Sequence, residues 1–190
     1  NLVLEGSLQR AGAMVRVTYA LVDANTRRQL RADTITASAS DPFAIEDRVV
    51  RSALDNLGIE LQPDEKRTLA TYGTREPVAY DFYLQGRGYL QDYHRPENIE
   101  AAIAVFNRAL TQDSKYALAY AGLGEAYWHK YQLNQESSWA GEALKACRKS
   151  VELMPGTPSG HTCLGVVYDG TGKYPQAVEE FSRALALEPT

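Results

Sequence analysis

The chain has 190 residues, with 20 Lys and Arg against 24 Asp and Glu, a net charge of −4 and 44% hydrophobic residues. This composition is that of a folded globular protein, and it excludes wholesale disorder, a collagen-like fibre and a coiled-coil rod. The acidic balance argues against a nucleic-acid partner, because such a partner requires basic residues that neutralise phosphates. No apolar run approaches the roughly 20 residues of a membrane span, so we expect no membrane contact within this chain.

The first forty residues show the pattern of short strands. One extended run ends at Leu8, a second covers 14–22 and a third covers 30–39, with turn residues at 10–12 and 23–26. Apolar and polar residues alternate in the second run, so one face of that strand is expected to contact water. Short turns between the runs predict an antiparallel meander of three strands, with the third run at an edge.

A helix is predicted between Asp41 and Gly58. Asp41 is a favourable N-cap, Pro42 suits the first helical position and Gly58 is a natural stop. Apolar residues recur at helical spacing between these ends, so the helix can cover one face of the sheet. Three strands and one helix form a very small core, which is marginal alone. We therefore expect the sheet edge either to pair with another copy of the chain or to dock on the helical half.

Residues 59–76 are expected to connect two halves of the chain, with a short helix from Pro63 to Leu69. The predicted fold class is α+β: a small antiparallel three-stranded sheet with one helix, followed by an all-α solenoid of three helical hairpins. The expected domains are 1–60, a linker over 61–76, and 77–190.

The end of the chain carries the clearest repeat signal. It reads Leu164-Gly165, Tyr168, Gly172, Tyr174, Ala177, Phe181, Ala184 and Pro189. Two earlier segments repeat this pattern less completely. The pattern resembles the tetratricopeptide (TPR) unit, a pair of antiparallel helices with a period of about 34 residues. The resemblance implies three repeats, at about 77–114, 115–157 and 158–190.

The middle repeat is longer than the last one. Leu123 to Ala143 spans 20 residues where Leu164 to Ala177 spans 13, and the difference, 20 − 13 = 7, is nearly two helical turns. If both helices share the extra residues, each gains about one turn and keeps its apolar face inward. We therefore predict a taller second hairpin with its tip at 132–135.

Several residues within the repeats are interpreted as structural. Gly86 and Gly88 indicate close helix packing rather than a nucleotide-binding loop, and His161 is interpreted as a core or groove-edge histidine. Four tyrosines at repeat-core spacing are assigned to the core: Tyr89, Tyr127, Tyr168 and Tyr174.

The N-terminal part resembles the second half of the TolB-like domain in the stretches 4–12, 15–18 and 21–24, and 41–47 matches the start of its last helix. That domain commonly precedes TPR arrays in bacterial serine/threonine protein kinases, adenylate cyclases and winged-helix regulators. The stretches 27–32 and 83–90 look most like the C-terminal part of acidobacterial-type kinases, which implies a kinase parent. Both chain ends fall within patterned runs, so we expect a piece of a longer polypeptide. A membrane-spanning parent would place it outside the cytoplasm; otherwise it would be cytoplasmic.

Catalytic motifs are not found in the sequence, which has no phosphate loop, kinase glycine-rich loop, catalytic-loop Asp or Asp-Phe-Gly motif. His94, His129 and His161 have no ligand spacing, and two cysteines cannot form a four-thiolate zinc site. We expect no catalytic residue, no metal and no cofactor. Cys147 and Cys163 fall on neighbouring helices. We expect buried free thiols, and the alternative is a disulfide formed in an oxidising compartment.

A partner-binding groove is expected on the first helix of each repeat, where the TPR register places aromatic and Arg side chains on the concave face. The residues assigned to this groove are Tyr80, Tyr83, Arg87, Gln91, Glu125, Trp128 and His129. Trp128 and His129 have an alternative place in the packing of the taller hairpin. The third repeat offers small or weakly adhesive side chains, so the site is expected on the first two repeats.

The basic clamp with which some TPR domains hold a C-terminal carboxylate is missing, because Ala121, Glu125, Thr162 and Val166 stand in its positions. We therefore expect another kind of protein or peptide partner. Two function classes remain open. One is a non-catalytic interaction or regulatory module of a signalling protein, with a serine/threonine kinase as the first choice of parent. The other is a ligand-binding or enzymatic accessory domain of an adenylate cyclase or transcriptional regulator, which would need convergent titratable groups in one pocket.

Overall fold

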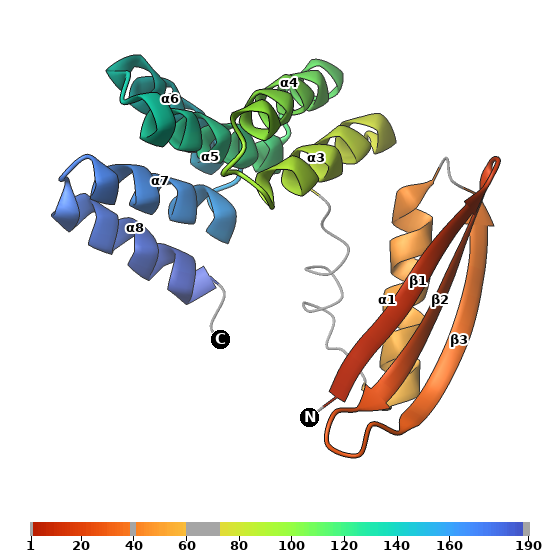
Figure 1. The fold of residues 1–190 in the computed structure, drawn as a ribbon. Coiled ribbons are helices and arrows are strands. Elements are labelled where there is room, and N and C mark those ends of the chain that lie inside the picture. The colour runs from red at the N-terminus through yellow and green to blue at the C-terminus, as the bar shows by residue number, and fades with distance from the viewer. Residues whose placement is uncertain (1, 39–40, 60–72, 188–190) are drawn as a thin grey trace. The chain divides into compact units, whose positions relative to one another are not determined.

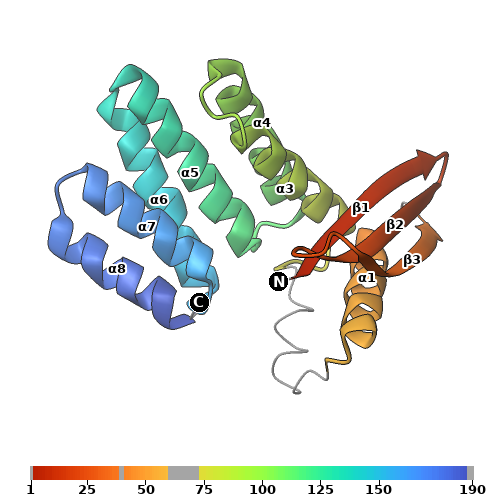
Figure 2. The ribbon, with the colours of Figure 1, turned by 60° about the horizontal axis from the view of Figure 1, so that its bottom comes forward.

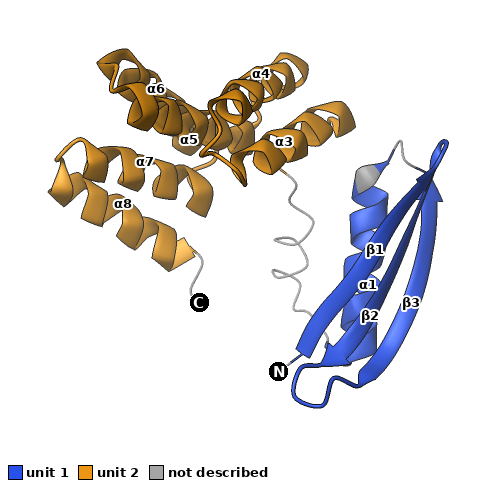
Figure 3. Cartoon of the chain, in the orientation of Figure 1, with its two compact units in different colours: residues 1–72 blue, residues 73–190 orange. Residues whose placement is uncertain are grey.

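The computed structural model describes residues 2–38, 41–59 and 73–187. The chain divides into two compact units, residues 1–72 and residues 73–190, which Figure 3 distinguishes by colour. The described residues form three strands followed by seven helices, so the predicted α+β class is confirmed. The short helix expected from Pro63 to Leu69 lies outside the described residues.

The first unit contains an antiparallel sheet in the order β1-β2-β3 (Figure 1). Its strands are β1 (Leu2–Ala11), β2 (Met14–Asp23) and β3 (Gln29–Ser38). The register is continuous between β1 and β2, whereas a bulge interrupts the β2–β3 pairing beside Leu21 and Val22. The predicted meander is confirmed, because each strand pairs with its neighbour in the chain.

Helix α1 (Pro42–Leu57) packs on one face of this sheet, along β3. The Asp41 carboxylate accepts a hydrogen bond from the Ala44 backbone N–H at 3.0 Å and so caps the first turn. Gly58 follows with φ 66°, a left-handed conformation that favours glycine and ends the helix. The side chains buried in this unit come mainly from β2 and β3: Val15, Tyr19, Leu21 and Ile35.

The second unit consists of three helical hairpins, which Figure 2 shows side by side in chain order. The hairpins are α3 (Pro77–Leu90) with α4 (Pro96–Gln112), α5 (Ala117–Asn134) with α6 (Ser137–Leu153), and α7 (Pro158–Gly170) with α8 (Tyr174–Leu187). Successive hairpins contact each other through α4 with α5 and α6 with α7. The first helices also contact one another, α3 with α5 and α5 with α7.

Glycines opposite phenylalanines set the close approach of these helices. A Cβ atom added to Gly86 or Gly122 would lie 2.5 Å from the Phe106 ring, and one added to Gly165 would lie 2.5 Å from the Phe181 ring. Such distances are shorter than any van der Waals contact, so a side chain larger than hydrogen would separate the helices. The interpretation of Gly86 as a packing residue is therefore confirmed. The same interpretation of Gly88 is wrong, because Gly88 is exposed and a Cβ added there would meet nothing within 4 Å.

The second hairpin is taller than the third, as predicted. Helices α5 and α6 have 18 and 17 residues, whereas α7 and α8 have 13 and 14. The inserted residues are thus shared between both helices of the hairpin. The chain turns at Gln135, which has φ 59°.

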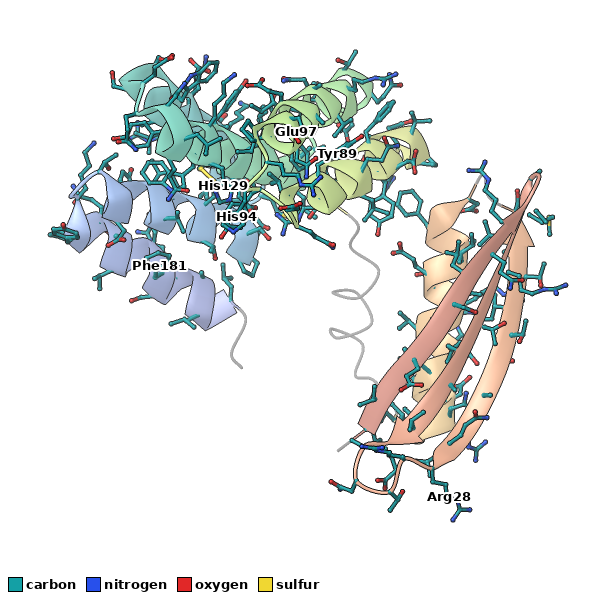
Figure 4. The ribbon with its side chains drawn as sticks, viewed as in Figure 1. Arg28, Tyr89, His94, Glu97, His129 and Phe181 are labelled. Atoms are coloured by element: carbon teal, nitrogen blue, oxygen red, sulfur yellow. A yellow bond between two sulfur atoms is a disulfide. The ribbon has the colours of Figure 1, made fainter. Side chains whose placement is uncertain are left out.

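The expectation of free thiols at Cys147 and Cys163 is wrong. The two residues form a disulfide between α6 and α7, with 5.5 Å between their Cα atoms, visible as a yellow bond in Figure 4. The space for it comes from Gly124 of α5, where an added Cβ would lie 2.6 and 2.7 Å from the two sulfurs. The repeat pattern predicted that the two helices carrying these cysteines are neighbours. It did not predict that Gly124 leaves room for the two sulfur atoms to meet.

Polar and aromatic residues of the repeats divide between the core and the surface. His161 is buried as predicted, with Nδ1 2.6 Å from Glu180 Oε2 and Nε2 2.9 Å from the Pro155 carbonyl oxygen. The assignment of Tyr89 and Tyr174 to the core is wrong, because their exposed fractions are 40% and 64%. Tyr89 lies in the last turn of α3, and Tyr174 is the first residue of α8, so neither lies between two packed helices.

None of the described helices is long and apolar enough to cross a membrane.

Candidate functional site

Helices α3, α5 and α7 line a groove with a volume of about 450 Å³. Its side chains recur every three or four residues, which is the spacing of one helix face. The lining residues are Tyr83 and Arg87 from α3; Leu118, Ala121, Gly122, Glu125, Trp128 and His129 from α5; and Pro158, Ser159, Thr162, Cys163, Val166 and Val167 from α7. The groove is thus one continuous surface across all three hairpins.

An ion pair joins the first two hairpins within this groove. The Arg87 guanidinium donates a hydrogen bond to Glu125 Oε2, and both side chains are partly exposed. Burial alone would raise the pKa of Glu125, but the neighbouring His129 and Arg87 outweigh it and hold that pKa below its ordinary value. Among the residues that the structure describes, Arg87 is the only Arg or Lys that lines the groove, and Glu125 is the only Asp or Glu. The permanent charges of the groove therefore cancel.

His129 closes one end of the groove in an aromatic cluster. Its ring stacks on Tyr93 with 4.1 Å between centroids and 10° between planes, and Tyr93 lies 4.4 Å from the His94 ring. His129 Nδ1 is 3.1 Å from Gln132 Oε1, and Nε2 is 3.9 Å from Glu125 Oε1. Figure 4 shows His94 and His129 close together in the helical unit. These contacts hold the His129 ring in place. His129 therefore lines the groove, as assigned from the sequence, and also packs against neighbouring side chains, as the alternative proposed.

Five of the seven residues assigned to the groove from the sequence line it: Tyr83, Arg87, Glu125, Trp128 and His129. Tyr80 and Gln91 do not. Tyr80 is buried in the first turn of α3, where its ring stacks on Tyr83 with 6.4 Å between centroids. Gln91 follows the last residue of α3 and is exposed away from the groove.

Trp128 contributes to the groove floor rather than to an exposed recognition surface. Only 5% of it is exposed, and a Cβ added to Gly170 of α7 would lie 2.1 Å from its ring. The ring therefore fills the space between α5 and α7, as the hairpin-core alternative anticipated.

Burial raises the pKa of Tyr83, whose ring contacts those of Phe106 and Tyr116.

The third hairpin supplies six lining residues from α7, including Thr162 and Val166. That the partner binds mainly the first two repeats stays a prediction. Leu118 and Pro158 were missed, although each stands three or four residues before another lining residue. Helical spacing carried forward from Ala121 and Thr162 could have found both.

Metal or acid–base chemistry has no evident arrangement in the described part of the chain. There, no group of three or more His, Cys, Asp or Glu side chains could hold a metal ion. In the groove, Glu125 contacts both Arg87 and His129.

Comparisons with known proteins agree with this geometry. Family models match residues 91–130, as "TPR repeat", and residues 158–190, as "Tetratricopeptide repeat". The helical unit therefore consists of TPR repeats. The first TPR domain of the human RPAP3 protein is similar, with a TM-score of 0.51, 18% identity and coverage of 60% of this chain and 80% of that one. A thermophilic TPR protein of Thermus thermophilus is similar with a TM-score of 0.55, 21% identity and coverage of 79% and 74%.

A curated relative extends the similarity beyond the repeats. "Putative adenylate cyclase 3" of Rhizobium meliloti (strain 1021) is 27% identical over 171 residues, which cover 86% of this chain. The matched stretch of 171 residues is longer than either of the two units, so the match includes residues of both units. The chain spans 28% of the length of this relative.

Proposed function

We propose that the chain is a non-catalytic protein-interaction module whose TPR groove binds a segment of a protein partner. The observation that carries this proposal is the continuous groove lined by α3, α5 and α7. The two fixed charges among its described lining residues, Arg87 and Glu125, neutralise each other. A concave surface with aromatic side chains and Arg suits recognition of a peptide segment. Proteins and peptides are therefore the proposed partners.

The chemistry of the lining favours an uncharged, largely apolar segment. Ala121, Glu125, Thr162 and Val166 line the groove at the positions of the basic clamp. A TPR domain of similar fold, the first TPR of Spaghetti (RPAP3), was solved with the HSP90 peptide SRMEEVD, with a TM-score of 0.50, 18% identity and coverage of 62% and 85%. Among the lining residues that the structure describes, a carboxylate of such an acidic peptide would meet no unpaired Lys or Arg. Desolvation of that carboxylate would therefore oppose binding.

We also propose that the module belongs to a signalling enzyme, which it regulates or positions through its partner. The relative in Rhizobium meliloti supports a parent of the adenylate cyclase type, and it supports this type over the kinase parent expected from the sequence. The assignment of the first unit to the second half of a TolB-like domain remains part of this proposal. Its support is the order of three antiparallel strands and one helix.

Peptide display on the whole chain tests the proposed binding. A library of random peptides is selected on the protein, and the affinity of the enriched peptide is measured by fluorescence anisotropy. Val166→Arg places a charged chain in the groove, and we expect it to weaken binding about tenfold or more. Val178→Arg is the matched control, because Val178 lies on α8 outside the groove and is 65% exposed. Equal binding by both variants would contradict the proposal.

The proposed lack of catalysis has a direct test. The purified chain is incubated with ATP and a divalent cation, and the formation of cyclic AMP and of ADP is followed. We expect neither product above the level of a boiled sample. Product formation that is abolished by Glu125→Gln would contradict the proposal, because it would assign chemistry to the groove.

A further inference from the structure

The two edges of the sheet differ in how far they are protected from pairing. At the β3 edge, Arg31 and Asp33 oppose Leu21 and Tyr19, so these charged residues lie on the buried face of the sheet. Asp33 accepts a hydrogen bond from Ser52 of α1, and the bulge in the β2–β3 pairing lies on the same strand. Bulges and charges on the inner face are devices that prevent strand addition at an edge.

The β1 edge has fewer of these devices: Arg10, opposite Val15 near the end of the strand, is its one charged residue on the buried face. β1 pairs with β2 through ten consecutive residues without a bulge, and it contains no proline or lysine. Its outer edge carries no partner strand among the residues that the structure describes. Every residue of β1 is exposed. A long, regular and uncovered edge strand is a template for the addition of another strand.

Apolar side chains accompany this open edge on the face that α1 covers elsewhere. Leu4 opposes Leu21 and Leu8 opposes Val17, so both leucines share the face that is buried over β2 and β3. Yet Leu4 is 52% exposed and Leu8 is 66% exposed, since α1 packs along β3, at the other edge of the sheet. The core of this unit is therefore open on the side of β1.

We infer that the β1 edge is an interface between two copies of this chain, which pair antiparallel through β1 into a continuous six-stranded sheet. A two-fold axis at Gly6 places Leu4 of each copy opposite Leu8 of the other on the buried face. On the opposite face, the same axis places Glu5 opposite Ser7. The strand carries one Glu and one Arg, so its two copies do not repel each other.

The occupant is a second copy because the strand is complementary to itself in this register. Leu4 and Leu8 of one copy lie opposite Leu8 and Leu4 of the other. No like charges oppose each other, and Gly6 has no side chain at the two-fold axis. Moving the axis to Ser7 would instead place Leu4 opposite Arg10 and Leu8 opposite Gly6. The register centred on Gly6 is therefore the one that pairs Leu4 with Leu8, and it places Leu2 opposite Arg10 at the strand ends.

Sedimentation equilibrium of the whole chain tests this interface. We expect the wild-type mass to rise from one chain to two chains with increasing protein concentration. Leu8→Lys places a charge on the leucine cluster of both copies, and we expect it to raise the dissociation constant about tenfold or more. Leu30→Lys is the matched control, since Leu30 is 45% exposed on β3, and we expect it to dimerise like the wild type.

Cross-linking tests the register itself. In the double variant Leu4→Cys/Leu8→Cys, opposite residues of the two copies come within the Cα separation of a disulfide, and we expect a covalent dimer under oxidation. Leu4→Cys/Leu30→Cys should not cross-link. A wild type that stays monomeric, Leu8→Lys dimers as tight as those of the wild type, or equal cross-linking by both double variants would each overturn the inference.

Discussion

The two units bury their apolar residues in opposite ways. In the TPR unit each hairpin covers the apolar face of its neighbour, and Phe106 is fully buried against two glycines of adjacent helices. In the sheet unit one helix covers only part of the buried face, and Leu4 and Leu8 of β1 are more than half exposed. The repeat unit therefore packs its apolar faces between its own hairpins, although Val178 and Leu185 of α8 stay exposed, whereas the sheet unit leaves the apolar side chains of a whole edge strand uncovered.

The largest effect is expected at the centre of the TPR packing. Phe106→Ala leaves a cavity between α3, α4 and α5, and we expect the free energy of unfolding of this unit to fall by about 4 kcal/mol. Both tryptophans, Trp128 and Trp139, lie in this unit, so their fluorescence in urea follows its unfolding. Tyr89→Ala in the same repeat is the control, because Tyr89 is 40% exposed. Equal losses in both variants would contradict the described packing.

The disulfide should stabilise the same unit somewhat less. Cys147 and Cys163 are 16 residues apart, and reduction of a bond that closes such a loop is expected to lower the free energy of unfolding by about 3 kcal/mol. Urea unfolding with and without dithiothreitol measures this difference. The double variant Cys147→Ala/Cys163→Ala should not respond to the reductant. Two titratable thiols in the native, unreduced protein would show that the bond is absent.

In the sheet unit, the loss of one cap should have a smaller effect. Asp41→Ala removes the hydrogen bond to the Ala44 N–H, and we expect α1 to lose about 1 kcal/mol. Hydrogen exchange of the α1 backbone amides reads this loss directly. Asp41→Asn keeps an acceptor oxygen at the cap and should restore most of the protection. A loss as large as that of Phe106→Ala would break the contrast between the two units.

The smallest expected effect is a change in one titration. The Ser52 hydroxyl and the Thr34 N–H donate to Asp33 and hold the pKa of its carboxyl below the ordinary value of 3.8. This contribution to stability is present above pH 3.8 and is lost as the pH falls through the lowered pKa of the folded state. We expect Ser52→Ala to raise the pKa of Asp33, as measured by NMR titration. Asp23, whose pKa is lowered by the N–H groups of Thr26 and Asn25, should not change.

Local patterns in the sequence were sufficient for much of this fold. The period of Gly and aromatic residues predicted the hairpins, because glycines such as Gly86 and Gly165 face the rings of Phe106 and Phe181 across a helix pair. The count from Leu123 to Ala143 predicted the taller hairpin, because whole turns keep the same face inward. Asp41 and Gly58 marked both ends of α1, because capping depends on neighbouring residues only.

Features that depend on distances between helices were not accessible in this way. The disulfide depends on the gap left by Gly124 between two other helices. Whether Trp128 lies in the groove or in the core depends on the approach of Gly170, 42 residues further along the chain. The share of α7 in the groove depends on the stacking of α5 and α7, which no local pattern contains.

The central claim is that the partner occupies the groove formed by α3, α5 and α7. An NMR titration of the whole chain with the peptide selected by display tests it most directly. The account predicts that the largest shifts in backbone amide signals fall on the groove residues, Arg87, Glu125 and Val166 among them, while the signals of β1 stay unchanged. Largest shifts on α4, α6 and α8, or on β1, would contradict it.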